Sequence, residues 1–216
     1  MAKVSKKWLE IVISGVPGFK APKEGLEQYV TPADIAADLV WSAFMAGDVE
    51  GRVVHDLGCG TGRLALASSM LGSKYVVCSD VDEDALSVAS EVLIKSSLTP
   101  YDLVLADLRN ASPFRDSECV AIMNPPFGVK SRGADIDFLK TALTTCGTVY
   151  SIHKLSEGFY EVIKDLMRDV NSSYEVLKTI KFPLRASLSK HKRKVVFVDS
   201  VIIKVTRNIK TPLTQV

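Results

Sequence analysis

From residue 52 to residue 170, short apolar runs alternate with longer segments in which apolar and polar residues repeat with a helical period. The short runs are rich in β-branched residues, as is typical of strands that helices cover on both faces. Such an alternation predicts a parallel, doubly wound α/β sheet. We expect strands at 52–57, 75–80, 101–107, 119–124 and 148–153, and helices at 62–71, 82–96, 134–146 and 156–170.

The N-terminal part precedes this alternation and has a helical pattern of its own. Residues 3–14 predict a short amphipathic helix. A second helix runs to Met45, with Thr31 as its N-cap and Pro32 at its first helical position. We therefore expect residues 1–50 to form a helical cap on the sheet.

The C-terminal part lacks the alternation. Segments 173–182 and 195–205 both predict long strands, and no helix is predicted between them. They are expected to form an antiparallel hairpin, preceded by a helix that Ser156 caps. The whole chain, residues 1–216, is thus expected to be one α/β domain with a mostly parallel sheet of seven strands.

Composition narrows the class of protein only slightly. The 216 residues are 47% hydrophobic and 24% charged, which is ordinary for a globular domain. A net charge of +2 neither demands nor excludes a nucleic-acid partner. We find neither a signal peptide nor an apolar run long enough to span a bilayer, so the expectation is an intracellular, cytoplasmic protein (nuclear or nucleolar also fits a eukaryotic source).

The cysteines give no sign of a metal site. Cys59, Cys78, Cys119 and Cys146 are scattered and include no C-x-x-C pair. Neither a zinc site nor a disulfide framework is indicated, and we expect four small, buried, reduced side chains.

A glycine-rich loop joins the first predicted strand to its helix and reads DLGCGTG, 56–62. Closely spaced glycines allow a tight turn and let backbone N–H groups approach a ligand near a helix N-terminus. A dinucleotide site has a small residue at the third position of its glycine motif, whereas here Gly58 and Gly60 are followed by Arg63. The loop predicts a ligand site but argues against a nicotinamide or flavin cofactor.

Acidic residues end the next two predicted strands. Asp80 stands twenty-two positions after Gly58, where a carboxylate can accept both hydroxyls of a ribose. Its alternative role is to cap the following helix, and one side chain can serve both purposes. Asp107 is a similar candidate for an adenine amino group, again with a helix cap as the alternative.

The tetrapeptide NPPF, 124–127, follows the fourth predicted strand. An exocyclic amine of adenine is a poor nucleophile because its lone pair is delocalised into the ring. The side-chain oxygen of Asn124 and the carbonyl of Pro125 can each accept one amine proton, which directs the nitrogen lone pair out of the ring plane. Pro125 and Pro126 hold these acceptors in place beforehand, and Phe127 offers a face for base stacking. Alone the tetrapeptide indicates a proline turn; after the glycine loop and Asp80 it predicts an amine-binding clamp.

Taken together, DLGCGTG, Asp80 and NPPF resemble class I S-adenosylmethionine-dependent methyltransferases of the amino-methylating type. Over nearly its whole length the chain resembles the methyltransferase-like protein 5 family, which methylates N6 of an adenosine in small-subunit ribosomal RNA. The resemblance implies a Rossmann-like fold, S-adenosylmethionine as the cofactor and structured RNA as the substrate. Its motifs are EQYVT (27–31), VVHDLGCGTG (53–62), DVDEDAL (80–86), MNPPFGVK (123–130), DFLKTAL (137–143), VYSIHK (149–154) and HKRK (191–194).

The resemblance also implies roles for the residues at matching positions. The catalytic residues are Asn124, Pro125, Pro126 and Phe127. The cofactor-binding residues are Gln28, Thr31, Asp56, Gly58, Gly60, Thr61, Arg63, Asp80, Val81, Asp107, Leu108 and Asn124, so the N-terminal cap contributes to the site. The family's eukaryotic members work with a small zinc-binding methyltransferase-activator protein. The strand at 101–107, a sheet edge in this fold, is the expected pairing surface.

Basic residues just past the clamp and in the C-terminal hairpin are candidates for contact with RNA phosphates. They are Lys130, Arg132, Lys190, His191, Lys192, Arg193 and Lys194. A solvated hairpin loop is the alternative for the last five. The segment before HKRK lacks the aromatic residues of other family members, which argues against base stacking from this loop. Two other functions stay open: methylation of a protein glutamine amide, which is also planar and conjugated, and a non-catalytic RNA-binding scaffold.

Overall fold

The computed structural model describes residues 4–109, 114, 117–128, 130–186 and 194–208. Its strands are β1 (Val53–Leu57), β2 (Tyr75–Asp80), β3 (Tyr101–Leu105), β4 (Ser117–Met123), β5 (Cys146–Lys154), β6 (Ser172–Ala186) and β7 (Lys194–Arg207). Its helices are α1 (Lys6–Ser14), a 3₁₀ turn η1 (Glu24–Leu26), α2 (Ala33–Met45), α3 (Arg63–Met70), α4 (Glu83–Ser96), α5 (Ala134–Thr145) and α6 (Phe159–Asp169). Every helix and strand expected from the sequence is present in the expected order. Among the described residues, no helix is long and apolar enough to cross a membrane.

The strands form a single seven-stranded sheet in the order β3-β2-β1-β4-β5-β7-β6. Strands β1 to β5 run parallel, and β7 is antiparallel to both β5 and β6. The expected mostly parallel sheet with an antiparallel C-terminal hairpin is therefore confirmed. The chain leaves β1 toward β2 and β3 and later returns to place β4 on the other side of β1. Strand order thus reverses between β1 and β4, where such sheets bind ligands at their carboxyl ends.

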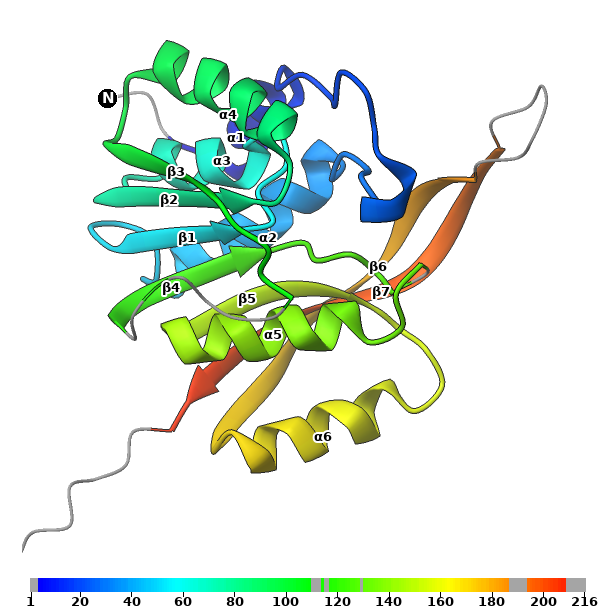
Figure 1. Cartoon of the computed structure of the whole chain (residues 1–216). Coiled ribbons are helices and arrows are strands. Elements are labelled where there is room, and N and C mark those ends of the chain that lie inside the picture. Colours follow the sequence, from blue (N-terminus) through cyan, green and yellow to red (C-terminus); the bar gives the residue numbers. More distant parts are fainter. Residues whose placement is uncertain (1–3, 110–113, 115–116, 129, 187–193, 209–216) are drawn as a thin grey trace, which may run out of the picture.

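Helices cover both faces of the sheet (Figure 1). Strand β4 shows why its sequence is a continuous apolar run. Val120 and Ile122 face the core cluster beneath α1, α2 and α3, whereas Ala121 and Met123 face the cluster beneath α5 and α6. Alternate side chains of a strand point to opposite faces, so a strand covered on both faces needs apolar residues at every position.

The C-terminal hairpin is longer than the sequence pattern predicts. Pairing of β6 with β7 extends from Ser172–Arg207 to Ala186–Lys194. Strand β5 accompanies β7 only as far as Ser200. Residues 181–186 and 194–199 therefore form a two-stranded arm that projects beyond the rest of the sheet (Figure 1).

Three local expectations are wrong. Thr31 does not cap α2, because the N-cap position is Pro32 and the Thr31 hydroxyl binds Asn124 instead. Ser156 does not cap α6, which begins after Gly158 in the left-handed conformation, with φ of 77°. Strand β3 ends at Leu105, so Asp107 lies in the following loop rather than at the strand end.

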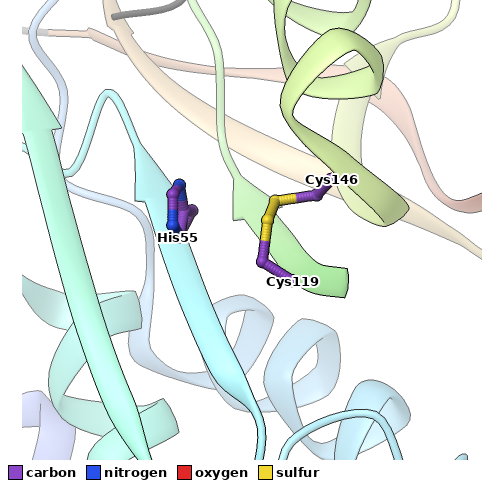
Figure 2. A group of neighbouring side chains, drawn as sticks. All are labelled: His55, Cys119 and Cys146. Atoms are coloured by element: carbon purple, nitrogen blue, oxygen red, sulfur yellow. A yellow bond between two sulfur atoms is a disulfide. The ribbon is translucent and has the colours of Figure 1, made fainter. Parts of the chain in front are cut away.

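The expectation of four separate, reduced cysteines is also wrong. Cys119 and Cys146 form a disulfide, whereas Cys59 and Cys78 are free and buried. The two bonded residues are 27 positions apart and meet because β4 and β5 are neighbouring parallel strands. His55 lies beside them on β1 (Figure 2), and its ligand atoms and theirs lie within 4.8 Å of one another. Cysteine binds metals as the thiolate, and disulfide sulfurs are not thiolates, so His55, Cys119 and Cys146 do not form a metal site in this oxidised state.

Candidate active site

A cleft opens at the carboxyl ends of β1 and β4, where strand order reverses. Its walls are the glycine-rich loop, the segments that follow β2 and β3, the clamp after β4, and the start of α5. Residues 25–29 of the N-terminal segment line its remaining side, together with Phe19. A smaller pocket adjoins it and is lined by Thr31, Thr61, Arg63 and Asn124. The fold thus gathers most of the candidate residues around one cavity.

The glycine-rich loop owes its conformation to glycine at each of its three positions. Gly58, Gly60 and Gly62 all have positive φ, of 71°, 53° and 83°. A Cβ on Gly60 would lie 2.9 Å from the ring of Phe19, and one on Gly58 would lie 3.1 Å from Phe138. Side chains here would both strain the backbone and fill the floor of the cleft. Glycine at these positions therefore keeps the loop free of side chains and lets the two rings pack against it.

Asp80 ties this loop to the end of β2. One carboxylate oxygen accepts the Gly60 N–H at 2.8 Å, and the other accepts the Asp82 N–H at 2.9 Å. Burial raises the pKa of the Asp80 carboxyl, while these hydrogen bonds favour its charged form. A carboxylate has about four lone-pair sites, so acceptor capacity remains on the side facing the cleft. Asp80 can therefore hold ribose hydroxyls while it fixes the loop.

Asp56 lies beneath the loop and does not reach the cleft. It is fully buried, and one oxygen accepts the Ala65 N–H at 2.8 Å. Its other oxygen has no hydrogen-bond partner among the described residues, and burial raises the pKa of Asp56 to about 8. In this structure the side chain anchors the start of α3 rather than lining the cofactor-binding cleft.

Asp82 binds the N-terminal segment to the cleft. Its carboxylate caps α4 and also accepts hydrogen bonds from Lys23 Nζ at 2.5 Å and Gln28 Nε2 at 2.6 Å. These contacts hold the pKa of Asp82 below its usual range, against the effect of burial. Gln28, expected to contact a ligand, therefore has its amide engaged by protein groups while it still lines the cleft. Sequence reasoning missed Lys23 and Phe19, since no local pattern marks them.

The far end of the cleft is formed by the segment after β3. Asp107 accepts three hydrogen bonds from Arg109, two from its guanidinium and one from its backbone N–H. This pairing lowers the pKa of Asp107. The Leu108 carbonyl accepts the Thr141 hydroxyl at 2.8 Å, and the exposed Val81, which follows the neighbouring strand β2, also lines the cleft. Asp107, Leu108 and Val81 thus line the part of the cleft where an adenine is expected.

The clamp has its two acceptors in different states. Asn124 Nδ2 donates to the Thr31 hydroxyl at 2.8 Å, while Asn124 Oδ1 is buried with no hydrogen-bond partner among the described residues. The Pro125 carbonyl accepts the Tyr29 hydroxyl at 3.2 Å. A buried carbonyl oxygen without a donor is costly, which makes this atom a candidate acceptor for a ligand's donor group.

Phe127 is less accessible than the sequence suggests. Its ring is 6% exposed and packs against Tyr29 and Phe182, with ring centroids 5.4 Å and 5.1 Å away. Tyr29 and Phe182 also contact each other, at 5.3 Å. The three rings form one aromatic cluster behind the clamp, and stacking of a base on Phe127 stays a prediction.

The basic residues predicted to bind RNA are only partly described. Lys130 and Arg132 are exposed and flank Ser131, which lines the cleft. Lys130 Nζ is 2.9 Å from Glu24, and its N–H donates to Glu27. Lys190, His191, Lys192 and Arg193 lie outside the described residues, as does the side chain of Lys194.

Comparison with known proteins places this geometry in a family. The family model for the methyltransferase small domain matches residues 31–181. The rRNA N6-adenosine-methyltransferase Mettl5 of Drosophila melanogaster is 37% identical over 90% of this chain and 92% of its own length. The METTL5 enzyme of Danio rerio is 34% identical over 93% of this chain and 98% of its own length.

Solved structures agree with this assignment. A protein of Pyrococcus horikoshii described as a candidate RNA methyltransferase superposes with a TM-score of 0.84. It is 34% identical to this chain, and the match covers 96% of this chain and all of that one. The resemblance drawn from the motifs is thereby confirmed. The chain belongs to the methyltransferase small domain family and, within it, to the methyltransferase-like protein 5 family.

Proposed function

We propose that this chain is an S-adenosylmethionine-dependent methyltransferase that acts on N6 of an adenosine in ribosomal RNA, most specifically in the small subunit. Its full-length relatives are named for rRNA adenosine N6 methylation. The observation that carries the proposal is the buried, unpartnered Oδ1 of Asn124 beside the Pro125 carbonyl, at a cleft with a bare glycine floor. Together these groups suit a planar amine next to a nucleoside-containing donor.

The residues of the cleft fit the methyl donor. S-adenosylmethionine supplies, when bound, a methyl group on a positively charged sulfur. Asp80 offers acceptors for ribose hydroxyls, and Asp107 with the Leu108 backbone offers partners for an adenine edge. The Gly58–Gly60 turn has no side chain at its two glycines, which lets a ligand approach its backbone closely.

The clamp activates the acceptor amine by geometry rather than by a base. Asn124 Oδ1 accepts one amine proton and the Pro125 carbonyl accepts the other on its second lone pair, beside the Tyr29 hydroxyl. Both acceptors are fixed before binding, because prolines restrict the backbone around them. Positioning of this kind supplies several kcal/mol of the barrier reduction, and no carboxylate base is required.

The target adenosine must leave its stack to reach this clamp. Lys130 and Arg132 lie beside Ser131, which lines the cleft, and carry charge suited to the flanking phosphates. Phe127 is held by Tyr29 and Phe182, so the aromatic cluster supports the clamp from behind.

We also propose a protein partner for the edge strand β3. It is the first strand of the sheet order, and its Leu105 side chain is 60% exposed. The small zinc-binding activator implied by the family resemblance would add a strand there, because an open edge offers unpaired N–H and C=O groups.

The ladder shows which residue tests this pairing. The Ala106 N–H donates to Asp80 on β2, so by alternation the Val104 N–H points inward and the Leu105 N–H points outward. Leu105→Pro is expected to abolish co-purification with a co-expressed activator while the melting temperature stays near that of the wild type. Leu105→Ala, which keeps the N–H, serves as the control. Unchanged co-purification of Leu105→Pro would exclude this edge as the partner site.

The function itself is tested by labelling total RNA and total protein with tritiated donor and mapping the labelled residue. The proposal expects label on adenosine N6 of rRNA, whereas label on a protein glutamine or no donor binding would favour the alternative functions.

In Asn124→Ala, kcat is expected to fall on the order of a hundredfold or more with donor affinity retained, because one preorganised acceptor is lost. Asn208→Ala, an exposed residue bonded only to Asn171 by the contacts described, is the matched control.

A further inference from the structure

Residues 27–31 contact both sides of the cleft. Glu27 accepts the Lys130 N–H at 2.6 Å, just past the clamp, and Gln28 binds Asp82 on the donor side. Between these contacts, Tyr29 and Thr31 each bind one acceptor residue of the clamp. The segment is therefore more than a lid over the donor, since two of its side chains touch the groups that would hold the substrate amine.

The contact with Thr31 holds the Asn124 side chain in the orientation that the structure shows. A side-chain amide can rotate by half a turn and exchange its oxygen with its NH₂ group. Of these two groups, only the oxygen can accept an amine proton. Thr31 Oγ1 accepts from Nδ2 at 2.8 Å, which leaves Oδ1 buried and unpartnered among the described residues.

Thr31 is itself held in place. Its backbone carbonyl accepts Arg63 Nη1 at 2.5 Å, and Arg63 Nη2 donates to the Val16 carbonyl at 3.0 Å. Burial lowers the pKa of the Arg63 guanidinium, although it remains charged at neutral pH because arginine titrates far above it. The large residue after the glycine loop, which argues against a dinucleotide, thus anchors the segment that orients Asn124.

We infer that Thr31 is a positioning residue for methyl transfer, which holds the Asn124 amide through its NH₂ group and so leaves the oxygen free to accept a proton of the target amine. Tyr29 assists by holding the Pro125 carbonyl and packing against Phe127. Burial raises the pKa of the Tyr29 phenol, so it stays a hydrogen-bond donor throughout the physiological range. The role of Thr31 in catalysis rests on the proposed function. The contact between Thr31 and Asn124 rests only on the hydrogen bond that joins them.

The test compares Thr31→Val, which removes the hydroxyl at nearly constant volume, with Thr31→Ser, which keeps it. In Thr31→Val, kcat is expected to fall about ten- to a hundredfold, with the Kd for the donor within twofold of the wild type. Thr31→Ser is expected to restore kcat. Thr144→Val, which removes an exposed α5 hydroxyl far from the clamp, is the control and should leave kcat unchanged.

A second readout does not depend on activity. The side-chain amide signals of Asn124, identified by their loss in Asn124→Ala, should shift in NMR spectra of Thr31→Val but not of Thr31→Ser. If the wild-type protein labels no RNA but this shift occurs, the proposed function fails and the positioning contact stands. The inference would be overturned if Thr31→Val kept the wild-type kcat, or if its donor affinity fell by as large a factor as its kcat. It would also be overturned if the Asn124 signals did not shift in Thr31→Val.

Discussion

The disulfide between Cys119 and Cys146 encloses the whole clamp, because Asn124–Phe127 lie between the two bonded residues. A cross-link reduces the entropy of the unfolded chain by an amount that grows with the logarithm of the number of residues in the loop it closes. For a separation of 27 residues the chain-entropy relation gives about 3.5 kcal/mol at 25 °C. For a chain of this size that corresponds to a rise in melting temperature of roughly 7–14 °C.

The double variant Cys119→Ala/Cys146→Ala tests this value by urea unfolding with and without a thiol reductant. We expect the free energy of unfolding to fall by about 3.5 kcal/mol relative to the oxidised wild type. With reductant present the two proteins should unfold within about 1 kcal/mol of each other, because the cross-link is then absent from both unfolded states.

The matched control is Cys59→Ala/Cys78→Ala, which removes two buried free thiols. Its loss of stability reports packing alone and should not depend on reductant. If the gap between the wild type and the Cys119/Cys146 double variant were equally large with and without reductant, the cost would come from packing. The entropic reasoning would then be refuted.

Two further predictions concern the glycine-rich loop. Burial raises the pKa of Asp56 to about 8 from 3.8, so the folded protein retains a proton that the unfolded chain releases above about pH 4. The free energy of unfolding of the wild type should therefore fall by about 1.4 kcal/mol per pH unit between those values. Asp56→Asn should remove this pH dependence, as measured by urea titrations at several pH values. Equal pH dependence in the two proteins would contradict the raised pKa of Asp56. A Cβ on Gly62 would lie 3.0 Å from Ala89, whereas Gly47, with a similar positive φ, has open space. Gly47→Ala should destabilise the protein by the roughly 1–3 kcal/mol of backbone strain alone. Gly62→Ala should destabilise it by more, because strain and the contact with Ala89 add, as measured by thermal unfolding. Equal losses in the two variants would exclude an effect of Ala89.

The arrangement of helices and strands could be predicted because each buried strand carries a local signature. The run CVAIM in β4 is apolar at every position, and the structure buries it on both faces. Features that depend on distant neighbours could not be predicted. The Cys119–Cys146 bond follows from the adjacency of β4 and β5, and the length of the arm follows from β6 pairing with β7 beyond the last β5 residue.

The candidate site shows the same division. The glycine loop and the clamp are each short contiguous motifs, and Asp80 ends a strand, so all three could be identified as candidates from the sequence. The partners that orient them are not: Thr31 reaches Asn124 across 93 residues, and Tyr29 reaches Pro125 across 96. Asp56 was misplaced for a related reason, since a carboxylate beside a glycine loop gives no sign of whether it points toward the ligand or toward the helix beneath.

The described part of the arm has a length that can be compared with that of a nucleic-acid strand. Phe182 at its base touches Phe127, and β6 continues four residues farther to Ala186, a rise of roughly 13 Å. That span equals about four stacked nucleotides at roughly 3.4 Å each. Under the proposed function, RNA lying along this described part of the arm would be in contact with the protein for about four nucleotides beyond the clamp.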